Sequence, residues 1–212
     1  MPMFASRTRV SRAAFAACST AVIAILAAAM TVSGRAAARD VLTFRGAHGW
    51  QIECTVGSVI HLLSEERPRE ESGSWRIGTM DSTTSVVLFS LAAPVCLAVA
   101  RYAFAVGEIG TGWVGAVSWL LVFSALLSAQ YVGWLLPGAA IAFAERRRRV
   151  AAMTAAVALL TAAYWTIFSS VIEGAPLAML LLLARNALLI ALAVDATRSV
   201  ARASTAGAAT GV

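Results

Sequence analysis

The sequence contains no lysine: all 17 of its basic residues are arginine. With alanine so abundant, this bias reflects a GC-rich coding sequence, and the pI of about 10.2 carries no inference about nucleic acid. Nucleic-acid binding needs positive charge on one soluble face, whereas these arginines are scattered along the flanks of apolar segments. Charge of either sign is also scarce, at 13% of residues against roughly 25% in a soluble domain. Together with a mean hydropathy of +0.78, this scarcity indicates a multi-pass membrane protein.

Cysteine and catalytic motifs are equally sparse. Cys18, Cys54 and Cys96 lie far apart and form no CxxC pair, which argues against a disulfide framework. The chain has no Walker A, GxGxxG, HExxH or GxSxG motif. His48, His61 and their acidic neighbour Glu53 match no standard metal-ligand spacing, so we expect no metal and no cofactor. An intramembrane enzyme is the least favoured function, because no nucleophile–base pair can be located.

Four long apolar segments follow residue 84: 85–106, 113–134, 150–172 and 176–197. Each is long enough to cross a hydrocarbon core of about 30 Å. Trp113 and Trp134 are 21 residues apart, which predicts one helix with an aromatic anchor at each interface. Ser124 and Ser128 would give that helix a small-residue packing face. The predicted fold is all-α: an integral membrane bundle with a four-helix core (84–197) of two hairpins, followed by a disordered tail (198–212).

The first 83 residues are harder to interpret. Residues 1–32 hold three arginines and then the apolar run 13–32, which reads as a fifth hydrophobic helix, or else as a secretory signal. Residues 33–83 form a polar loop, in which alternation from Trp50 to Val56 predicts a short hairpin with 41–45. Residues 64–74 read as a solvated, flexible linker. Because Met80-Asp81 resembles a start, a further interpretation makes residues 1–79 an extension that the bundle does not need.

The run Glu145-Arg146-Arg147-Arg148-Arg149 sets the expected orientation. Four guanidiniums are rarely moved across a membrane, so this turn and the C-terminus are predicted to be cytoplasmic, in the cell (inner) membrane. If residues 33–83 lie on the same side, twelve arginines are inside and three, at the N-terminus, are outside. The turns at Glu108 and Glu173 then face outward. The N-terminal arginines conflict with this arrangement, since they would have to cross the membrane.

Polar residues within or beside the apolar runs are the functional lead. A charged side chain inside a bilayer costs at least about 2.5 kcal/mol, so it normally faces a partner or a wet cavity. The candidate intramembrane polar site comprises Arg101, Glu108, Gln130, Glu173, Arg185 and Asn186. Arg185 lies roughly 14 Å along its helix from Pro176, and Glu173 or Glu108 is its expected partner. A structural buried pair and a functional site are both compatible with this pattern.

Two functions remain open from the sequence. The first is a small transport or channel-type component, or an accessory subunit of one, that uses the intramembrane arginine and glutamate residues. The alternative is a non-catalytic membrane anchor or assembly partner of a larger membrane complex. A water-filled cavity reaching Arg185 would favour transport, and a dry, paired arginine would favour the anchor. The expected partners are the lipid bilayer and either another membrane protein or a second copy of this chain; nucleic acid is not expected.

Overall fold

Two helices in the described part of the chain are long and apolar enough to cross a membrane, at Val87–Val106 and Pro176–Thr205. The computed structural model describes residues 48–209, together with isolated helical positions at 20, 24, 28 and 31. The chain divides into two units, 1–46 and 47–212, and the second is described below. The expected helix at 13–32 and strand at 41–45 therefore lie largely outside the described residues.

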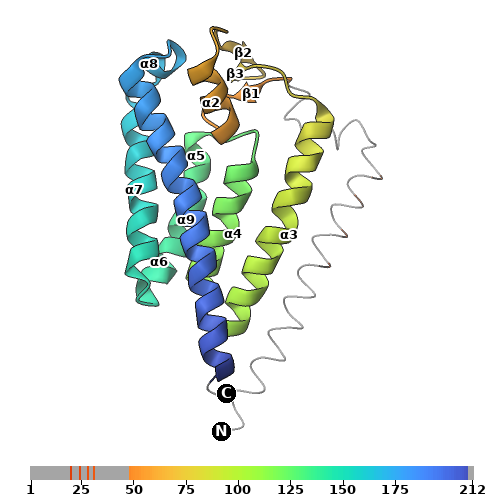
Figure 1. Cartoon of the computed structure of the whole chain (residues 1–212), viewed down its shortest axis with the longest axis vertical. Coiled ribbons are helices and arrows are strands. Elements are labelled where there is room, and N and C mark those ends of the chain that lie inside the picture. The colour runs from red at the N-terminus through yellow and green to blue at the C-terminus, as the bar shows by residue number, and fades with distance from the viewer. Residues whose placement is uncertain (1–19, 21–23, 25–27, 29–30, 32–47, 210–212) are drawn as a thin grey trace. The chain divides into compact units, whose positions relative to one another are not determined.

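The described chain is mostly helical, with one small sheet (Figure 1). Its elements are β1 (Trp50–Gln51), α2 (Thr55–Leu63), β2 (Arg69–Glu71), β3 (Ser74–Ile77), α3 (Ser82–Val106), α4 (Ile109–Phe123), α5 (Ala129–Val132), the 3-10 helix η1 (Gly133–Leu135), α6 (Leu136–Ala144), α7 (Arg148–Trp165), α8 (Phe168–Ile172) and α9 (Pro176–Ala209).

Helix α3 has clear local signals at both ends. Asp81 is its N-cap, and the carboxylate accepts the backbone N–H of Thr84 at 2.7 Å. At the other end Gly107 takes the left-handed conformation, φ +78°, which a side chain would disfavour. The expected segment 85–106 is thus a helix, and Pro94 lies inside it.

The predicted helix 113–134 is wrong. Helix α4 ends at Phe123, the chain reverses through residues 124–128, and η1 and α6 return alongside α4, while α5 contacts α7. Trp113 Nε1 donates to the carbonyl of Trp134 at 2.7 Å, so the two tryptophans are neighbours rather than anchors at opposite interfaces. Ser124 accounts for the break, because its hydroxyl accepts the N–H of Leu126 and donates to the same residue's carbonyl. Such local bonds compete with helical ones.

The reversal changes which turns share an end. Arg147 forms an ion pair with Glu108, and Glu145 accepts the N–H of Gly110 at 3.2 Å. The turn at 107–108 and the four-arginine turn therefore lie at one end of the helices. Residues 48–80 and the turn between α8 and α9 lie at the other end (Figure 1). The expectation that 33–83 shares a side with the arginines is thus wrong for the part described, as is the expectation that Glu108 lies opposite them.

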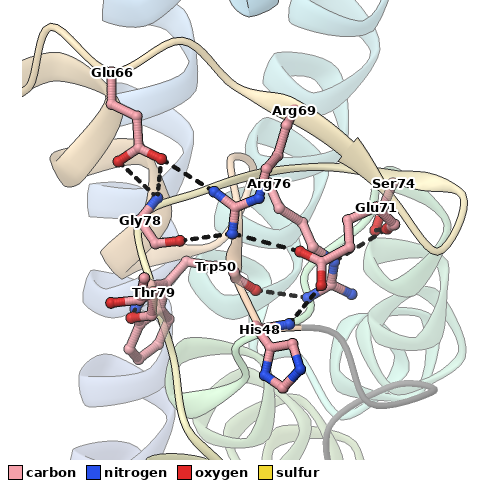
Figure 2. Close-up of polar contacts among 10 residues, drawn as sticks. His48, Trp50, Glu66, Arg69, Glu71, Ser74, Arg76, Gly78 and Thr79 are labelled. Carbon is pink, nitrogen blue, oxygen red and sulfur yellow. Dashed lines mark hydrogen bonds and ion pairs between the residues drawn. The ribbon is translucent and has the colours of Figure 1, made fainter.

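Residues 48–80, here called the cap, contain the sheet. Its order is β1-β3-β2, with both pairs antiparallel. Strand β2 falls in the segment expected to be a flexible linker, which instead forms a hairpin with β3 through Ser72 and Gly73, both at positive φ. Figure 2 shows Arg69 joining this hairpin to its surroundings: it bonds Glu66 at 3.0 Å and the carbonyl of Gly78 at 2.9 Å. Charges that read as solvated are therefore used in local pairing.

Helix α9 continues to Ala209, so the tail expected to be disordered from residue 198 is helical over most of its length. Alanine and arginine, which are frequent there, both favour helix. Just before this tail, Asp195 forms an ion pair with Arg149 at 3.3 Å, which joins α9 to the start of α7.

Glycines in the first turn of α4 allow close packing near the end of the helices that carries the four-arginine turn. A Cβ on Gly110 would lie 2.2 Å from the backbone nitrogen of Ala142 on α6, and one on Gly112 would lie 2.0 Å from Ala103 on α3. The small-residue face that was expected at Ser124 and Ser128 is therefore provided by glycine, roughly three to four turns before Ser124.

Candidate functional site

Arg185 is the most deeply buried charge of the helical segments, with 0% of its surface exposed. It lies on α9, and its Nη2 donates to the backbone carbonyl of Glu53 at 3.0 Å and to the Tyr164 hydroxyl at 3.2 Å. The guanidinium carbon also lies 5.1 Å from the centre of the Tyr164 ring. Arg185 thus connects α9 with α7 and with the cap.

Glu53 also brings a carboxylate to the cluster, which is linked to Arg185 through the Tyr164 hydroxyl rather than by a direct ion pair. One of its oxygens accepts the Tyr164 hydroxyl at 2.5 Å, and the other accepts the side-chain amide of Gln51 at 2.8 Å. Only 3% of the residue is exposed. Burial raises the pKa of the Glu53 carboxyl above its ordinary value of 4.5, while the Tyr164 hydrogen bond and the charge of Arg185 act in the opposite direction.

The start of α2 is fixed by the same group of residues. Asn186 donates to Ser58 Oγ at 2.9 Å, next to its longer contact of 3.4 Å with the Glu53 carbonyl. Cys54 is the N-cap, with its sulfur accepting the N–H of Gly57 at 3.2 Å. Burial raises the pKa of the Cys54 thiol to about 11, so it is a packing and capping group rather than a nucleophile.

The buried cluster, comprising Gln51, Glu53, Ser58, Tyr164, Arg185 and Asn186, is sealed. Each of its members is at most 5% exposed. Three cavities in the described part of the chain are lined by other residues, along α3 and α9, between α2 and α8, and between α5 and α7. The hydrogen bonding of the buried cluster is incomplete, however: Arg185 Nε and Nη1 find no acceptor, and Asn186 Oδ1 finds no donor, among the described residues.

The structure brings together two of the six residues expected to form an intramembrane site, Arg185 and Asn186. The other four lie elsewhere. Arg101 and Gln130 are exposed, Glu173 is exposed at the end of α8, and Glu108 pairs with Arg147. The expected pairing of Arg185 with Glu173 or Glu108 is wrong, because its hydrogen bonds go to Glu53 and Tyr164.

Glu53 and Tyr164 were missed because their segments looked ordinary. Glu53 was assigned to a polar loop and considered only as an unpromising metal ligand. The signal in the sequence is that Glu53 lies between the apolar residues Ile52 and Cys54; the structure buries all three. An acid inside an otherwise apolar stretch needs a partner when it is buried, and Arg185 was the cation without one.

No metal site is found among the residues that the structure describes, since no three His, Cys, Asp or Glu side chains lie together. His61 contacts the backbone carbonyl of Val171 through Nε2 at 2.7 Å. It joins α2 to α8.

The four-arginine turn is a second charged site. Arg147 lowers the pKa of the Glu108 carboxyl, mainly through their hydrogen bonds, and Glu108 raises the pKa of Arg147 in return. Arg146 takes a positive φ of +63°. The turn thus fixes the α6–α7 connection to the α3–α4 connection.

No known protein family, curated protein or solved structure matches this chain.

Proposed function

We propose that this protein is a multi-pass membrane protein of the cell (inner) membrane that acts as a non-catalytic anchor or assembly partner, with its helices holding the cap in a fixed position. The observation that carries this proposal is the sealed buried cluster. It ties the cap to α7 and α9 through hydrogen bonds between buried groups and opens to none of the cavities described above. A closed arrangement of this kind serves to position a segment rather than to conduct a solute.

The apolar surface supports the membrane assignment. Only 17% of the span window in α3 is buried, although the span is strongly apolar. Large side chains such as Val87, Phe89, Leu91, Leu97 and Phe104 are exposed along it. Soluble monomers rarely expose apolar patches beyond a few hundred Å². Lipid as the solvent accounts for this face, and α7 and the α4–α6 hairpin complete the membrane-embedded unit.

The arrangement of the turns supports a definite sidedness. In the described chain, six arginines lie at the end with the four-arginine turn or beyond it on α9 (Arg146–Arg149, Arg198 and Arg202), against three in the cap (Arg67, Arg69 and Arg76). The positive-inside rule then favours cytoplasmic arginines and C-terminus, with the cap on the far side. On charge grounds, a crossing by residues 13–32 or their removal as a secretory signal suits this sidedness, because Arg7, Arg9 and Arg12 precede the run. The earlier conflict at the N-terminus disappears.

Reporter fusions test the sidedness. An export-dependent phosphatase inserted at Gly73, in the β2–β3 turn, should be active, whereas a reporter that works only in the cytoplasm should be active after Arg149 and after Arg202. Phosphatase activity at Arg149 or Arg202 would contradict the proposed orientation.

The anchor function is tested by the mass of the native assembly. Mild extraction from the native membrane should give one complex heavier than any homo-oligomer of this chain, containing a second membrane protein in fixed ratio. Glu70→Arg, on the exposed hairpin, should weaken that complex, while Arg202→Glu, an exposed charge reversal at the other end, should not. A monodisperse species containing only this chain would count against the proposal.

Transport is the second candidate, and one observation favours it. Two guanidinium nitrogens of Arg185, Nε and Nη1, lack acceptors, and a guanidinium in that state suits an anion. Purified protein in liposomes should nevertheless give no chloride or proton flux above that of protein-free liposomes. A flux that disappears in the Glu53→Leu/Arg185→Leu double variant would favour transport over the anchor.

A further inference from the structure

Helix α2 buries its small and polar side and exposes its apolar side. Gly57, Ser58 and His61 are buried against the rest of the molecule. The opposite side carries four large aliphatic residues, and all of them are exposed: Val56 (38%), Val59 (43%), Leu62 (52%) and Leu63 (78%). A helix at an aqueous surface shows the reverse pattern. The exposed face of α2 is therefore unlike that of a helix that lies in water.

Contacts fix the depth of α2 along α9. The residue before its N-cap, Glu53, contacts Arg185 through the backbone carbonyl. Ser58, at the end of the first turn of α2, contacts Asn186. The upper end of α2 lies at the α8–α9 turn, where His61 contacts Val171 and a Cβ on Gly174 would lie 3.6 Å from the imidazole. Thus α2 runs antiparallel to the first nine residues of α9, a length of about 14 Å.

The outer side of α9 over this stretch is apolar. The exposed residues here and in the following two turns include Leu177, Leu180, Ala184, Ala187 and Ile190, which repeat at helical spacing, and none of the exposed residues is polar. This stripe begins at the second residue of a helix that is long and apolar enough to span a membrane. The hydrocarbon region therefore extends close to the start of α9, and α2 lies beside it at the same depth.

The segments before and after α2 also fit a boundary between water and hydrocarbon at the C-terminal end of this helix. Directly after Leu63 come Ser64, Glu65, Glu66 and Arg67, all exposed. Below α2, the backbone N–H groups of Gln51, Ile52 and Cys54 all donate to carbonyls within the protein: those of Ala125, Trp75 and Gln51, respectively. Non-helical backbone at membrane depth is tolerated only when it is satisfied internally in this way.

We infer that α2 is a re-entrant membrane helix whose exposed face, Val56, Val59, Leu62 and Leu63, contacts the acyl chains of the lipid leaflet on the side of the cap. This inference rests on the proposed membrane location. The break at residues 124–128 shortens the α4–α6 hairpin, and Gln51 and Glu53 contact that reversal through Ala125 and Ala129. Gly57 allows the tight entry, because a Cβ there would lie 2.1 Å from the Gln51 carbonyl.

Site-directed spin labelling of the full chain tests the inference. The three cysteines are first replaced by serine, which at position 54 retains an N-cap oxygen. Single labels are then placed by Val59→Cys on α2, Ala187→Cys on the outer side of α9 and Glu70→Cys on the exposed hairpin. The protein is reconstituted in vesicles of phosphatidylcholine and phosphatidylglycerol. Collision with oxygen, which concentrates in hydrocarbon, is compared with collision with a water-soluble nickel chelate.

The expected result is an oxygen-to-nickel ratio at position 59 that matches position 187 and exceeds position 70 several-fold. Nickel access at 59 with oxygen access at 187 overturns the inference and leaves the membrane proposal standing. Nickel access at both positions overturns the membrane proposal as well. Protection of position 59 from both reagents, with oxygen access at 187, also overturns the inference, since it means that a protein surface rather than lipid covers α2.

Discussion

At the scale of single residues, the molecule depends on a charge that is kept away from water. An arginine cannot lose its proton at accessible pH, so Arg185 needs an anion and acceptors wherever it is buried. The Glu53 backbone carbonyl and the Tyr164 hydroxyl accept its hydrogen bonds, and the Glu53 carboxyl bonds the same hydroxyl, which joins three segments that are distant in sequence. Because a carboxyl can take up a proton and a guanidinium cannot lose one, the two members of this pair are not equivalent.

This asymmetry predicts an order of stabilities. Glu53→Leu removes the carboxyl whose charge acts on the buried Arg185, although the backbone carbonyl at position 53 remains, and should be the most destabilising of the three changes, by up to roughly 3–5 kcal/mol. Arg185→Leu should cost less, because the Glu53 carboxyl can become neutral, and the double change should be the mildest. Thermal unfolding in detergent measures all three. Glu173→Gln, at the exposed C-cap of α8, is the matched control and should leave the unfolding temperature unchanged. A lower unfolding temperature for Glu173→Gln, with no change for Glu53→Leu, would instead support Glu173 as the partner of Arg185.

The Glu108–Arg147 pair predicts a pH dependence at the other end of the molecule. The folded-state pKa of Glu108 lies below its ordinary value of 4.5. Ionisation therefore contributes stability above pH 4.5, and that contribution is lost as the pH falls through the lower, folded-state value. The unfolding temperature of the wild type should drop toward that of Glu108→Gln on acidification, while the two differ at pH 7. Parallel curves from pH 7 to pH 3 would show that the pair contributes nothing; Glu70→Gln, at an exposed site, serves as the control.

At the scale of elements, the α4–α6 hairpin decides the arrangement. It reverses at residues 124–128 instead of continuing, and α2 lies beyond the reversal. Close packing of α4 on α6 keeps the two arms together, with Gly110 at the narrowest point. The hairpin therefore positions both the cap and the four-arginine turn.

Gly110→Ala tests this packing. The added Cβ would lie 2.2 Å from the Ala142 nitrogen, so the backbones must separate, at a cost of typically 1–3 kcal/mol for overpacking. Gly133→Ala is the matched control, because open space surrounds that glycine in η1. The thermal unfolding temperature should fall for Gly110→Ala and should stay level or rise slightly for Gly133→Ala. Equal effects would mean that the α4–α6 contact is not tight.

Much at this scale could be predicted from sequence, and the failures have local causes. The ends of α3 follow from Asp81 and Gly107, and the burial of Arg185 follows from its place in a long apolar run. The break in the 113–134 segment could not be predicted, since an unbroken apolar run reads as helix and only a serine side chain closes the turn. The partner of Arg185 was missed because an alternating run at residues 50–56 indicated a strand, although α2 begins at Thr55.

At the scale of the whole molecule, the cap is part of the helical unit. Residues 47–212 form one unit, and Met80 itself is buried. A bundle that begins at Met80, as considered from the sequence, would lack Glu53 and Ser58, which contact Arg185 and Asn186 on α9.

Truncation tests this view. A chain starting at Ala47 should insert and accumulate, since it keeps the buried cluster whole. One starting at Met80 should be degraded or should accumulate poorly, unless Arg185→Leu is introduced, which should restore part of its level. Membrane-fraction immunoblots measure all three. Equal accumulation of the two truncated chains would mean that the cap contributes nothing to stability.

The pairing of Glu53 with Arg185 also sets an order of events during synthesis. The two residues are 132 positions apart, which at roughly 5–20 residues per second corresponds to about 7–26 seconds of translation. For that interval the carboxylate has been made and its arginine has not. In the proposed membrane location, the helices from α3 to α7 enter the bilayer as they emerge, whereas the segment around Glu53 lacks its contacts with Arg185 until α9 arrives. The first described segment of the chain to be synthesised is therefore the last to take its place.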